Sequence, residues 1–169
     1  MIASLVKRML TEPAPRVLGK FIWNFGWKGM RAVQRFEKRT RTGGSFPAFL
    51  FLSVTNRCNL RCQGCWVSPT DPAGDMPVAM LDGIIAEANR HGSYFFGILG
   101  GEPLLYEPLW DVLARHPESY FILFTNGQLL DEGVARRMRE LGNVSPLVSI
   151  EGDAVVSDVR RGGRDVYAR

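Results

Sequence analysis

Residues Phe49–Cys65 read FLFLSVTNRCNLRCQGC, an apolar run followed directly by three cysteines. The segment Phe49–Val54 has the length and the apolar character of a strand buried on both faces. Cys58, Cys62 and Cys65 then follow, separated by three and by two residues. This order predicts a strand whose C-terminal end carries a loop rich in sulfur ligands. In parallel sheets the chemistry collects at that end of the strands.

The rest of the chain predicts an alternation of helices and strands. Apolar residues at helical spacing indicate helices at 77–92, 107–115 and 131–142, and apolar runs indicate strands at 94–99, 120–124 and 147–150. Asp131 is a plausible N-cap of the third helix, and Gly142 a plausible end. Such an alternation favours an α/β fold with a parallel sheet and right-handed crossovers.

Polar or glycine-rich clusters follow all four predicted strands. The cysteines follow the first strand, Gly100–Pro103 follows the second, Thr125–Gly127 the third, and Glu151–Gly152 closes the fourth. Because the carboxyl ends of parallel strands share one edge, we expect these clusters to meet there. We expect Thr125 and Asn126 to form a turn rather than to line a pocket.

Composition excludes several classes of protein. A chain of 169 residues suits one domain, and 46% hydrophobic with 22% charged residues indicates a globular rather than a disordered chain. No apolar run approaches the roughly 20 residues of a membrane-spanning helix, which argues against an integral membrane protein. Three cysteines within eight consecutive residues exclude a disulfide-stapled secreted scaffold.

The charge is divided unequally along the chain. Residues 1–44 contain ten Lys and Arg against two Glu, a net charge of +8, whereas residues 45–169 contain eleven Arg against fifteen acids, a net charge of −4. Thr42–Ser45 reads as a linker. We therefore expect a basic amphipathic helical arm, 1–44, before a core, 45–169. We expect no nucleic-acid partner for the whole chain, because the basic excess belongs to the arm alone.

The arm contains one amphipathic helix, from about Arg16 to Arg39. Its apolar residues recur at steps of three or four, and further apolar residues widen that face; the set is Leu18, Phe21, Ile22, Trp23, Phe25, Trp27, Met30, Val33 and Phe36. Three interpretations remain open. The helix packs on its own domain, or residues 16–39 make peripheral contact with a membrane through apolar burial and attraction to anionic lipid, or the helix binds nucleic acid or a protein partner.

The cysteine loop predicts a metal centre. Thiolates are soft ligands that select zinc, copper(I) or iron–sulfur clusters. Structural zinc normally takes four ligands, and neither His91 nor His116 is near the loop in sequence. Three thiols without an obvious fourth ligand suit a four-iron cluster with one iron left open, with zinc as the alternative. We expect Arg57 and Arg61 to favour the thiolate form.

The cysteine motif, placed after the first strand, resembles the signature of the radical S-adenosylmethionine (radical SAM) enzymes. The glycine-rich cluster after the second strand resembles the second motif of that superfamily. The end of the fourth strand resembles the branch with SPASM-type, peptide-maturing and hopanoid-type members. The resemblance covers about residues 46–163, and its matching segments are 53–57, 58–65, 100–103, 148–152 and 161–162.

The resemblance implies a partial barrel and a radical SAM reaction. Cys58, Cys62 and Cys65 would hold a 4Fe-4S cluster whose fourth iron is chelated by S-adenosyl-L-methionine (SAM). Reductive cleavage of SAM would give a 5′-deoxyadenosyl radical that abstracts hydrogen from an unidentified substrate. The enzyme would take its electron from a donor such as flavodoxin or ferredoxin. It would be cytoplasmic, and peripheral at the inner membrane face if the arm contacts lipid.

The resemblance also assigns SAM-binding residues. The glycines would let the backbone approach the ligand, and a neighbouring carboxylate would accept from its ammonium group. Two polar residues on one face of the fourth strand would bind other parts of SAM, and an arginine would pair with its carboxylate. The residues are Gly100, Gly101, Glu102, Ser149, Glu151 and Arg161. The alternatives are an ordinary turn, a polar strand end and a solvated arginine.

The chain departs from the family pattern at two points. Many members carry an aromatic residue just before the last cysteine, where this chain has Gly64, so that Trp66 becomes the candidate for shielding the cluster or the adenine. Four βα units are present of an expected six, so we expect the chain to be an N-terminal fragment. The competing hypothesis is a non-catalytic iron–sulfur or zinc-binding module with a basic helix that binds a membrane or a partner.

Overall fold

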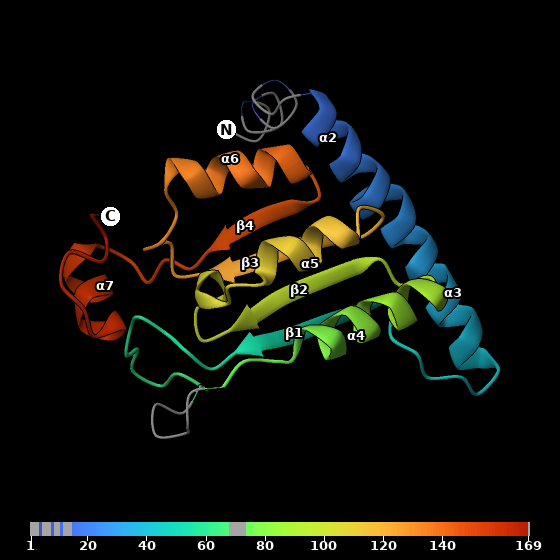
Figure 1. Ribbon diagram of the computed structural model, residues 1–169, viewed down its shortest axis with the longest axis horizontal. Coiled ribbons are helices and arrows are strands. Elements are labelled where there is room, and N and C mark those ends of the chain that lie inside the picture. The colour runs from blue at the N-terminus through green and yellow to red at the C-terminus, as the bar shows by residue number, and fades with distance from the viewer. Residues whose placement is uncertain (1–3, 5–7, 9–10, 12–14, 68–73, 169) are drawn as a thin grey trace.

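The computed structural model describes residues 4, 8, 11, 15–67 and 74–168. Four parallel strands form one sheet in sequence order: β1 (Phe49–Thr55), β2 (Phe95–Gly100), β3 (Tyr120–Thr125) and β4 (Val144–Val148). The helices between them are α4 (Val78–Arg90), η2 (Pro103–Leu105), α5 (Leu109–Arg115) and α6 (Glu132–Leu141), and α7 (Ala154–Arg161) follows β4 (Figure 1). The predicted α/β fold with four βα units of a partial barrel is confirmed.

The hydrophobic core lies between the sheet and helices α4, α5 and α6. The fully buried residues come alternately from strands and from helix faces: Leu81, Ile85, Phe96, Ile98, Leu109, Leu113, Phe121 and Leu123. Helix α6 begins and ends as the sequence predicts, because Asp131 accepts a hydrogen bond from the Val134 amide and Gly142 adopts a left-handed conformation.

The opposite face of the sheet is only partly covered. Phe49 and Phe51 are 40% and 64% exposed, so the prediction that the first strand is buried on both faces is wrong. The Phe51 ring lies over Gly97, where an added Cβ would come within 2.3 Å of its Cδ1 atom, and packs edge-on against Phe124. Side chains on one face of β1 therefore build the core, and the alternate side chains on the other face line an open surface.

Strand β4 begins three residues earlier than predicted. Val144 pairs with Phe121 and is buried in the core. Pro146 argued against a strand in the sequence, but β4 tolerates it because, among the described residues, β4 pairs only with β3. The strand also ends at Val148, so Ser149 and Glu151 lie beyond it instead of alternating within it.

The arm forms one continuous helical rod across the N-terminal ends of the strands (Figure 1). It consists of α2 (Pro15–Phe21), the π-helical η1 (Ile22–Lys28) and α3 (Gly29–Arg41). Apart from residues 4, 8 and 11, the arm before Pro15 lies outside the described residues. Among the described helices, none has both the length and the apolarity that a bilayer-crossing segment requires.

One face of this rod packs on the sheet, as one of the three interpretations expected. The Phe21 ring lies 5.5 Å from the Tyr120 ring, and the Phe25 ring lies 5.1 Å from the Phe95 ring. Lys20 and Lys28 add bonds from their ammonium groups to the carbonyl oxygens of Leu141 and Glu118, both at 2.6 Å.

We expect Leu113→Ala to lower the free energy of unfolding by about 2 to 5 kcal/mol, because it opens a cavity in a fully buried position. The matched control is Leu147→Ala, which removes the same atoms from a side chain that is 45% exposed. Denaturant unfolding monitored by circular dichroism measures both. Equal losses of stability would contradict the core described above.

Candidate cluster and cofactor site

The three thiols line a single cavity at the end of β1. It has a volume of about 270 Å³, and Asn56, Leu60, Arg61, Gly64 and Val67 complete its wall. The Cys65 amide donates to the carbonyl oxygen of Cys62, and Gly64 between them has a φ of +71°. That left-handed conformation favours glycine. It gives a local reason for Gly64 at the position where an aromatic residue was expected.

The donor set of this loop is three thiols in one cavity. All three cysteines are free thiols. Within the described residues, no three Cys, His, Asp or Glu side chains converge on one position where they could share a metal ion. Structural zinc normally takes four ligands, whereas three thiolates can each bond a different iron of a four-iron cluster and leave the fourth iron open. By the number and chemistry of its ligands, the donor set fits a four-iron cluster.

Arg161, which the sequence had assigned to SAM, forms a hydrogen bond with the Cys62 thiol. Burial raises the pKa of the Cys62 thiol, the charge of Arg161 and its hydrogen bond act in the opposite direction, and the other two cysteines add to the rise. Arg61 instead donates to the carbonyl oxygens of Cys58 and Leu60. At Cys62, the cation that favours the thiolate form is therefore Arg161, where we had expected Arg57 and Arg61.

Arg57 anchors the start of the cysteine loop. Its guanidinium pairs with the Asp75 carboxylate at 2.6 Å and donates to the carbonyl oxygen of Leu105 at 2.6 Å. The Thr55 hydroxyl donates to the same carboxylate at 2.6 Å. Burial alone would raise the pKa of Asp75, but the bonds from Thr55 and Arg57 outweigh it and lower the pKa. The anchor is therefore ionised at neutral pH.

The glycines of the second motif pack on the backbone of the cysteine loop. The Gly101 amide donates to the carbonyl oxygen of Thr55, and the Glu102 amide to that of Arg57, both at 2.8 Å. A Cβ on Gly100 would lie 2.2 Å from the Thr55 oxygen, and a Cβ on Gly101 would lie 2.2 Å from the Arg57 oxygen. A close approach to the chain itself thus requires glycine at both positions, and their approach to the ligand stays a prediction.

The Glu102 carboxylate lies fully buried between β2 and β3. One of its oxygens accepts from the Leu104 amide at 3.1 Å and from the Thr125 hydroxyl at 2.9 Å, and the other accepts from the Asn126 amide at 2.9 Å. This carboxylate therefore holds the ends of two strands together. Its predicted bond to an ammonium group would be additional to these three.

Asn126 connects the third strand to the cysteine loop. Its side-chain amide donates to the Asn59 side chain at 2.8 Å and lies 4.0 Å from the Cys58 sulfur. Its side-chain oxygen accepts from the Gln128 amide at 2.9 Å, so the expected turn is present as well. In the sequence, the only indication that Asn126 contacts the cysteine loop was its position at the end of a strand.

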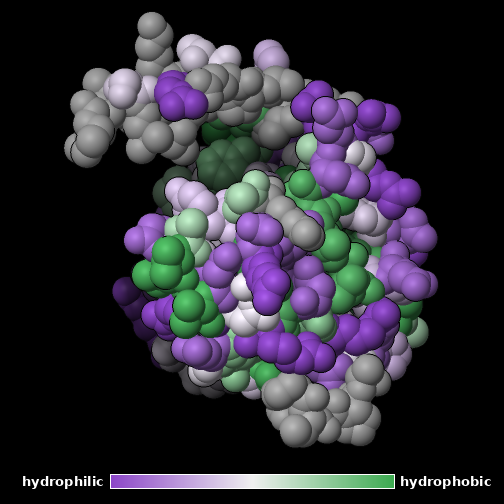
Figure 2. Space-filling view, turned by 90° about the vertical axis from the view of Figure 1, so that its left-hand side faces the viewer, coloured by the Kyte–Doolittle hydropathy of each residue, from purple (hydrophilic) through white to green (hydrophobic). Residues whose placement is uncertain are grey.

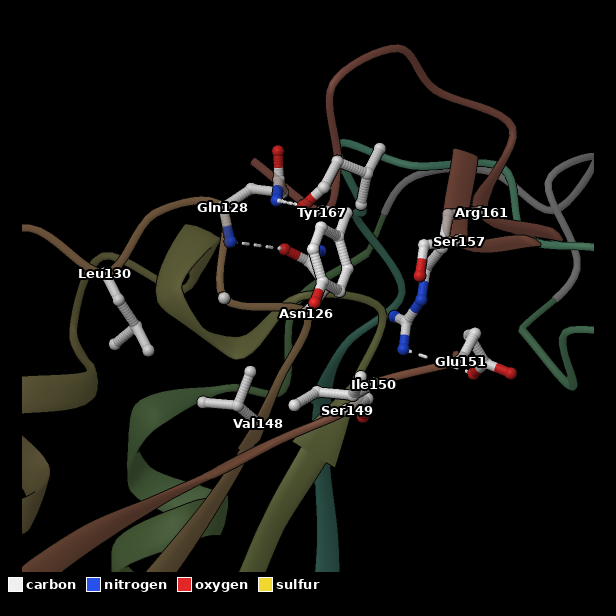
Figure 3. A pocket seen from close by; sticks show the side chains of 12 residues that line it. Asn126, Gln128, Leu130, Val148, Ser149, Ile150, Glu151, Ser157, Arg161 and Tyr167 are labelled. Carbon is white, nitrogen blue, oxygen red and sulfur yellow. Dashed lines mark hydrogen bonds and ion pairs between the residues drawn. The ribbon is translucent and has the colours of Figure 1, made fainter. Parts of the chain in front are cut away.

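A larger cavity of about 450 Å³ opens beside the ends of β3 and β4. It brings together three of the predicted SAM-binding residues, Ser149, Glu151 and Arg161, whereas Gly100, Gly101 and Glu102 are not among its lining residues. Figure 3 shows the Arg161 and Glu151 side chains pointing toward one another, with 3.2 Å between guanidinium nitrogen and carboxylate oxygen.

Arg161 is 6% exposed, so the alternative of a solvated arginine is wrong. Asn126 also lines the larger cavity, although we had expected it only to form a turn. Trp66 is 68% exposed and is not a lining residue of either cavity, so it does not shield the loop in this structure.

The end of α7 docks on the cysteine loop through its backbone. The Arg61 amide donates to the carbonyl oxygen of Arg161 at 3.3 Å, and the Gln63 amide to that of Arg160 at 2.7 Å. Gly162 ends the helix in a left-handed conformation, and a Cβ there would lie 2.5 Å from the Arg61 oxygen. Figure 2 shows this end of the molecule, where hydrophilic side chains predominate and hydrophobic ones form separate groups.

Comparison with known proteins identifies relatives of this arrangement. Residues 52–166 match the family described as the Radical SAM superfamily. The chain is 31% identical over 138 residues to the mycofactocin maturase MftC of Mycobacterium ulcerans, covering 78% of this chain and 37% of the maturase. It is 33% identical over 120 residues to a GTP 3′,8-cyclase of a Synechococcus strain, covering 68% of this chain and 35% of the cyclase.

Solved structures show the same fold. SuiB of Streptococcus suis, solved bound to the precursor peptide SuiA, superposes with a TM-score of 0.65 at 23% identity, over 80% of this chain and 32% of SuiB. The protein anSMEcpe with bound AdoMet superposes with a TM-score of 0.58 at 24% identity, over 71% of this chain and 37% of that protein. The chain thus spans about a third of the length of these relatives.

The family match, residues 52–166, includes every lining residue of the two cavities described above except Tyr167. Radical SAM proteins are enzymes that use a 4Fe-4S cluster together with SAM, and the donor set at the end of β1 fits that cluster. The chain belongs to the radical SAM superfamily.

Proposed function

We propose that the chain forms the cluster- and SAM-binding core of a radical SAM enzyme, with Cys58, Cys62 and Cys65 as the ligands of a 4Fe-4S cluster. The observation that supports this most directly is that three thiols of one short loop line one cavity, beside a larger cavity at the same edge of the sheet. When bound, the cluster and SAM supply reductive cleavage of the sulfonium and abstraction of hydrogen from a substrate.

The protein's own residues bind and orient SAM. We assign Ser149, Glu151 and Arg161, which line the larger cavity, to contacts with the nucleotide and the carboxylate of SAM. A guanidinium has five N–H donors, so Arg161 can hold a carboxylate in addition to its contacts with Glu151 and Cys62.

The second motif is assigned to the ammonium group of SAM. The backbone carbonyl oxygens of Gly100 and Gly101 are acceptors at the end of β2. One carboxylate oxygen of Glu102 accepts a single hydrogen bond, from Asn126, and has capacity for a second. An ammonium group bound there would complete the coordination of a carboxylate that already holds two strands in place.

The remaining parts of the proposal concern organisation and partners. Residues 1–44 form the arm and residues 45–169 the catalytic core. An electron donor such as flavodoxin or ferredoxin reduces the cluster. Residues 16–39 place the enzyme at the inner face of a membrane, and nucleic acid is not a partner. The relatives include a GTP cyclase and a mycofactocin maturase, so we propose a reaction class without a substrate.

Anaerobic reconstitution with iron and sulfide tests the proposal. We expect about four irons and four sulfides per chain, and release of 5′-deoxyadenosine when SAM and a reductant are added. A colourless protein that retains zinc and releases no deoxyadenosine would support the competing hypothesis of a non-catalytic module.

We expect Cys58→Ala, Cys62→Ala and Cys65→Ala each to lose most of the reconstituted iron, because each removes one of three thiolate ligands. Iron analysis and the visible absorption of the cluster measure this loss. Trp66→Ala is the control, since Trp66 follows Cys65 directly but is exposed and should leave the iron content unchanged. Full iron content in any cysteine variant would remove that residue from the ligand set.

We expect Glu102→Gln to lower the free energy of unfolding by about 1 to 3 kcal/mol, because an amide nitrogen then faces buried donors in place of an acceptor. Glu107→Gln makes the same chemical change at an exposed position and should leave stability unchanged. Thermal unfolding of the two variants side by side measures the difference. If they unfold alike, the buried carboxylate does not join β2 to β3 as described.

A further inference from the structure

The helical rod of the arm has a second apolar face, which the sheet leaves uncovered. Phe21 and Phe25 contact Tyr120 and Phe95 of the sheet, although Phe25 remains 43% exposed. Four other large apolar side chains on the same rod are about half exposed: Ile22 (54%), Trp23 (57%), Trp27 (48%) and Met30 (55%). We call these four residues the outer tryptophan face.

Aromatic and cationic groups alternate along this face. The rings of Trp23 and Trp27 stack with centroids 6.4 Å apart, and the Arg31 guanidinium lies 5.8 Å from the Trp27 ring. A cavity of about 280 Å³ is lined by both tryptophans together with Lys28, Arg31 and Arg35. Tyr94 and Glu118 complete its lining, so one carboxylate stands against three cationic side chains there.

The charge of the rod extends the same pattern. Residues 15–41 contain eight Lys and Arg against the single acid Glu37. Lys20, Lys28 and Arg39 donate to backbone oxygens of the core. The side chains of Arg31, Lys38 and Arg41 are exposed. The outer tryptophan face therefore lies within a strongly positive surface.

We propose that the outer tryptophan face docks on an anionic phospholipid bilayer, with the rod lying in the plane of the interface. This inference deepens the membrane contact in the proposed function by naming the face that makes it. Tryptophan is favoured at the level of the lipid headgroups, because its ring is apolar and its N–H is polar. Arg31 and Arg35 then meet the phosphates, and charge complementarity favours anionic lipid.

This assignment fixes the orientation of the enzyme. The rod crosses the N-terminal ends of the strands, whereas the cysteine loop and α7 lie at their C-terminal ends (Figure 1). A bilayer on the outer tryptophan face therefore leaves both cavities of the site facing away from the lipid. The contact would localise the enzyme at the membrane without opening its site into the bilayer.

Co-sedimentation with vesicles tests the proposal on the full chain. One set of vesicles contains phosphatidylcholine and phosphatidylglycerol in equal amounts, and the other contains phosphatidylcholine alone. We expect binding to the anionic vesicles only, and weaker binding as salt is added. The double variant Trp23→Ser, Trp27→Ser should bind with about a tenth of the affinity of the unsubstituted chain, or with less, since each indole contributes apolar burial.

The control is Trp66→Ser, which removes a tryptophan that is 68% exposed at the other end of the molecule and should bind as the unsubstituted chain does. Thermal unfolding verifies that each variant is folded. Undiminished binding of the double variant would overturn the assignment of the face while leaving membrane contact in place. Absence of binding by the unsubstituted chain would overturn both. A third outcome is that the unsubstituted chain self-associates and binds no vesicles, whereas the double variant does not self-associate. That result would identify a second copy of the chain as the occupant of the face and reject the lipid proposal.

Discussion

The backbones of two loops approach one another so closely at the edge of the sheet that no side chain fits between them. Gly100 and Gly101 pass over Thr55 and Arg57 at distances where a Cβ would collide with a carbonyl oxygen. Two amide-to-carbonyl bonds of 2.8 Å secure the contact. The cysteine loop leaves β1 from this point, so its position depends on the glycines of the next strand. The protein's own backbone therefore holds the cysteine loop in place, which preorganises it for a ligand.

Polar contacts then connect this glycine contact to the ends of the third and fourth strands. The Glu102 carboxylate holds Thr125 and Asn126, and Asn126 reaches Asn59 beside the first cysteine. Arg161 spans the distance between Cys62 and Glu151. All of these groups except the exposed Asn59 are buried or partly buried, so most of these bonds act in a setting where unpaired polar groups are costly. The network therefore orients the thiols and the larger cavity as one unit.

The arm contributes at the opposite end of the strands. Aromatic rings on its inner face contact the first residues of β2 and β3, and its outer face remains available to a partner. The one amphipathic pattern in the sequence thus corresponds to two apolar faces of the helical rod in the structure. The distinction matters because the interpretations given for the arm are compatible: packing on its own domain uses one face, and membrane contact would use the other.

Local sequence determined the elements and the chemistry of this protein. The order of strands and helices, the caps at Asp131 and Gly142, and three soft ligands in one loop all follow from neighbouring residues, and the structure reproduces the elements. The start of β4 was missed because Pro146 signals a turn, and the strand tolerates a proline because β4 is an edge strand of the sheet that the described residues form.

Only the tertiary structure decided which residues meet. It placed Arg161 beside Cys62, put Trp66 in solvent, and buried Glu102 among donors from β3. The physical reason is that these contacts join positions between 23 and 99 residues apart, as in Thr125 with Glu102 and Arg161 with Cys62. No periodicity or spacing in a single sequence encodes which distant side chains share a buried space.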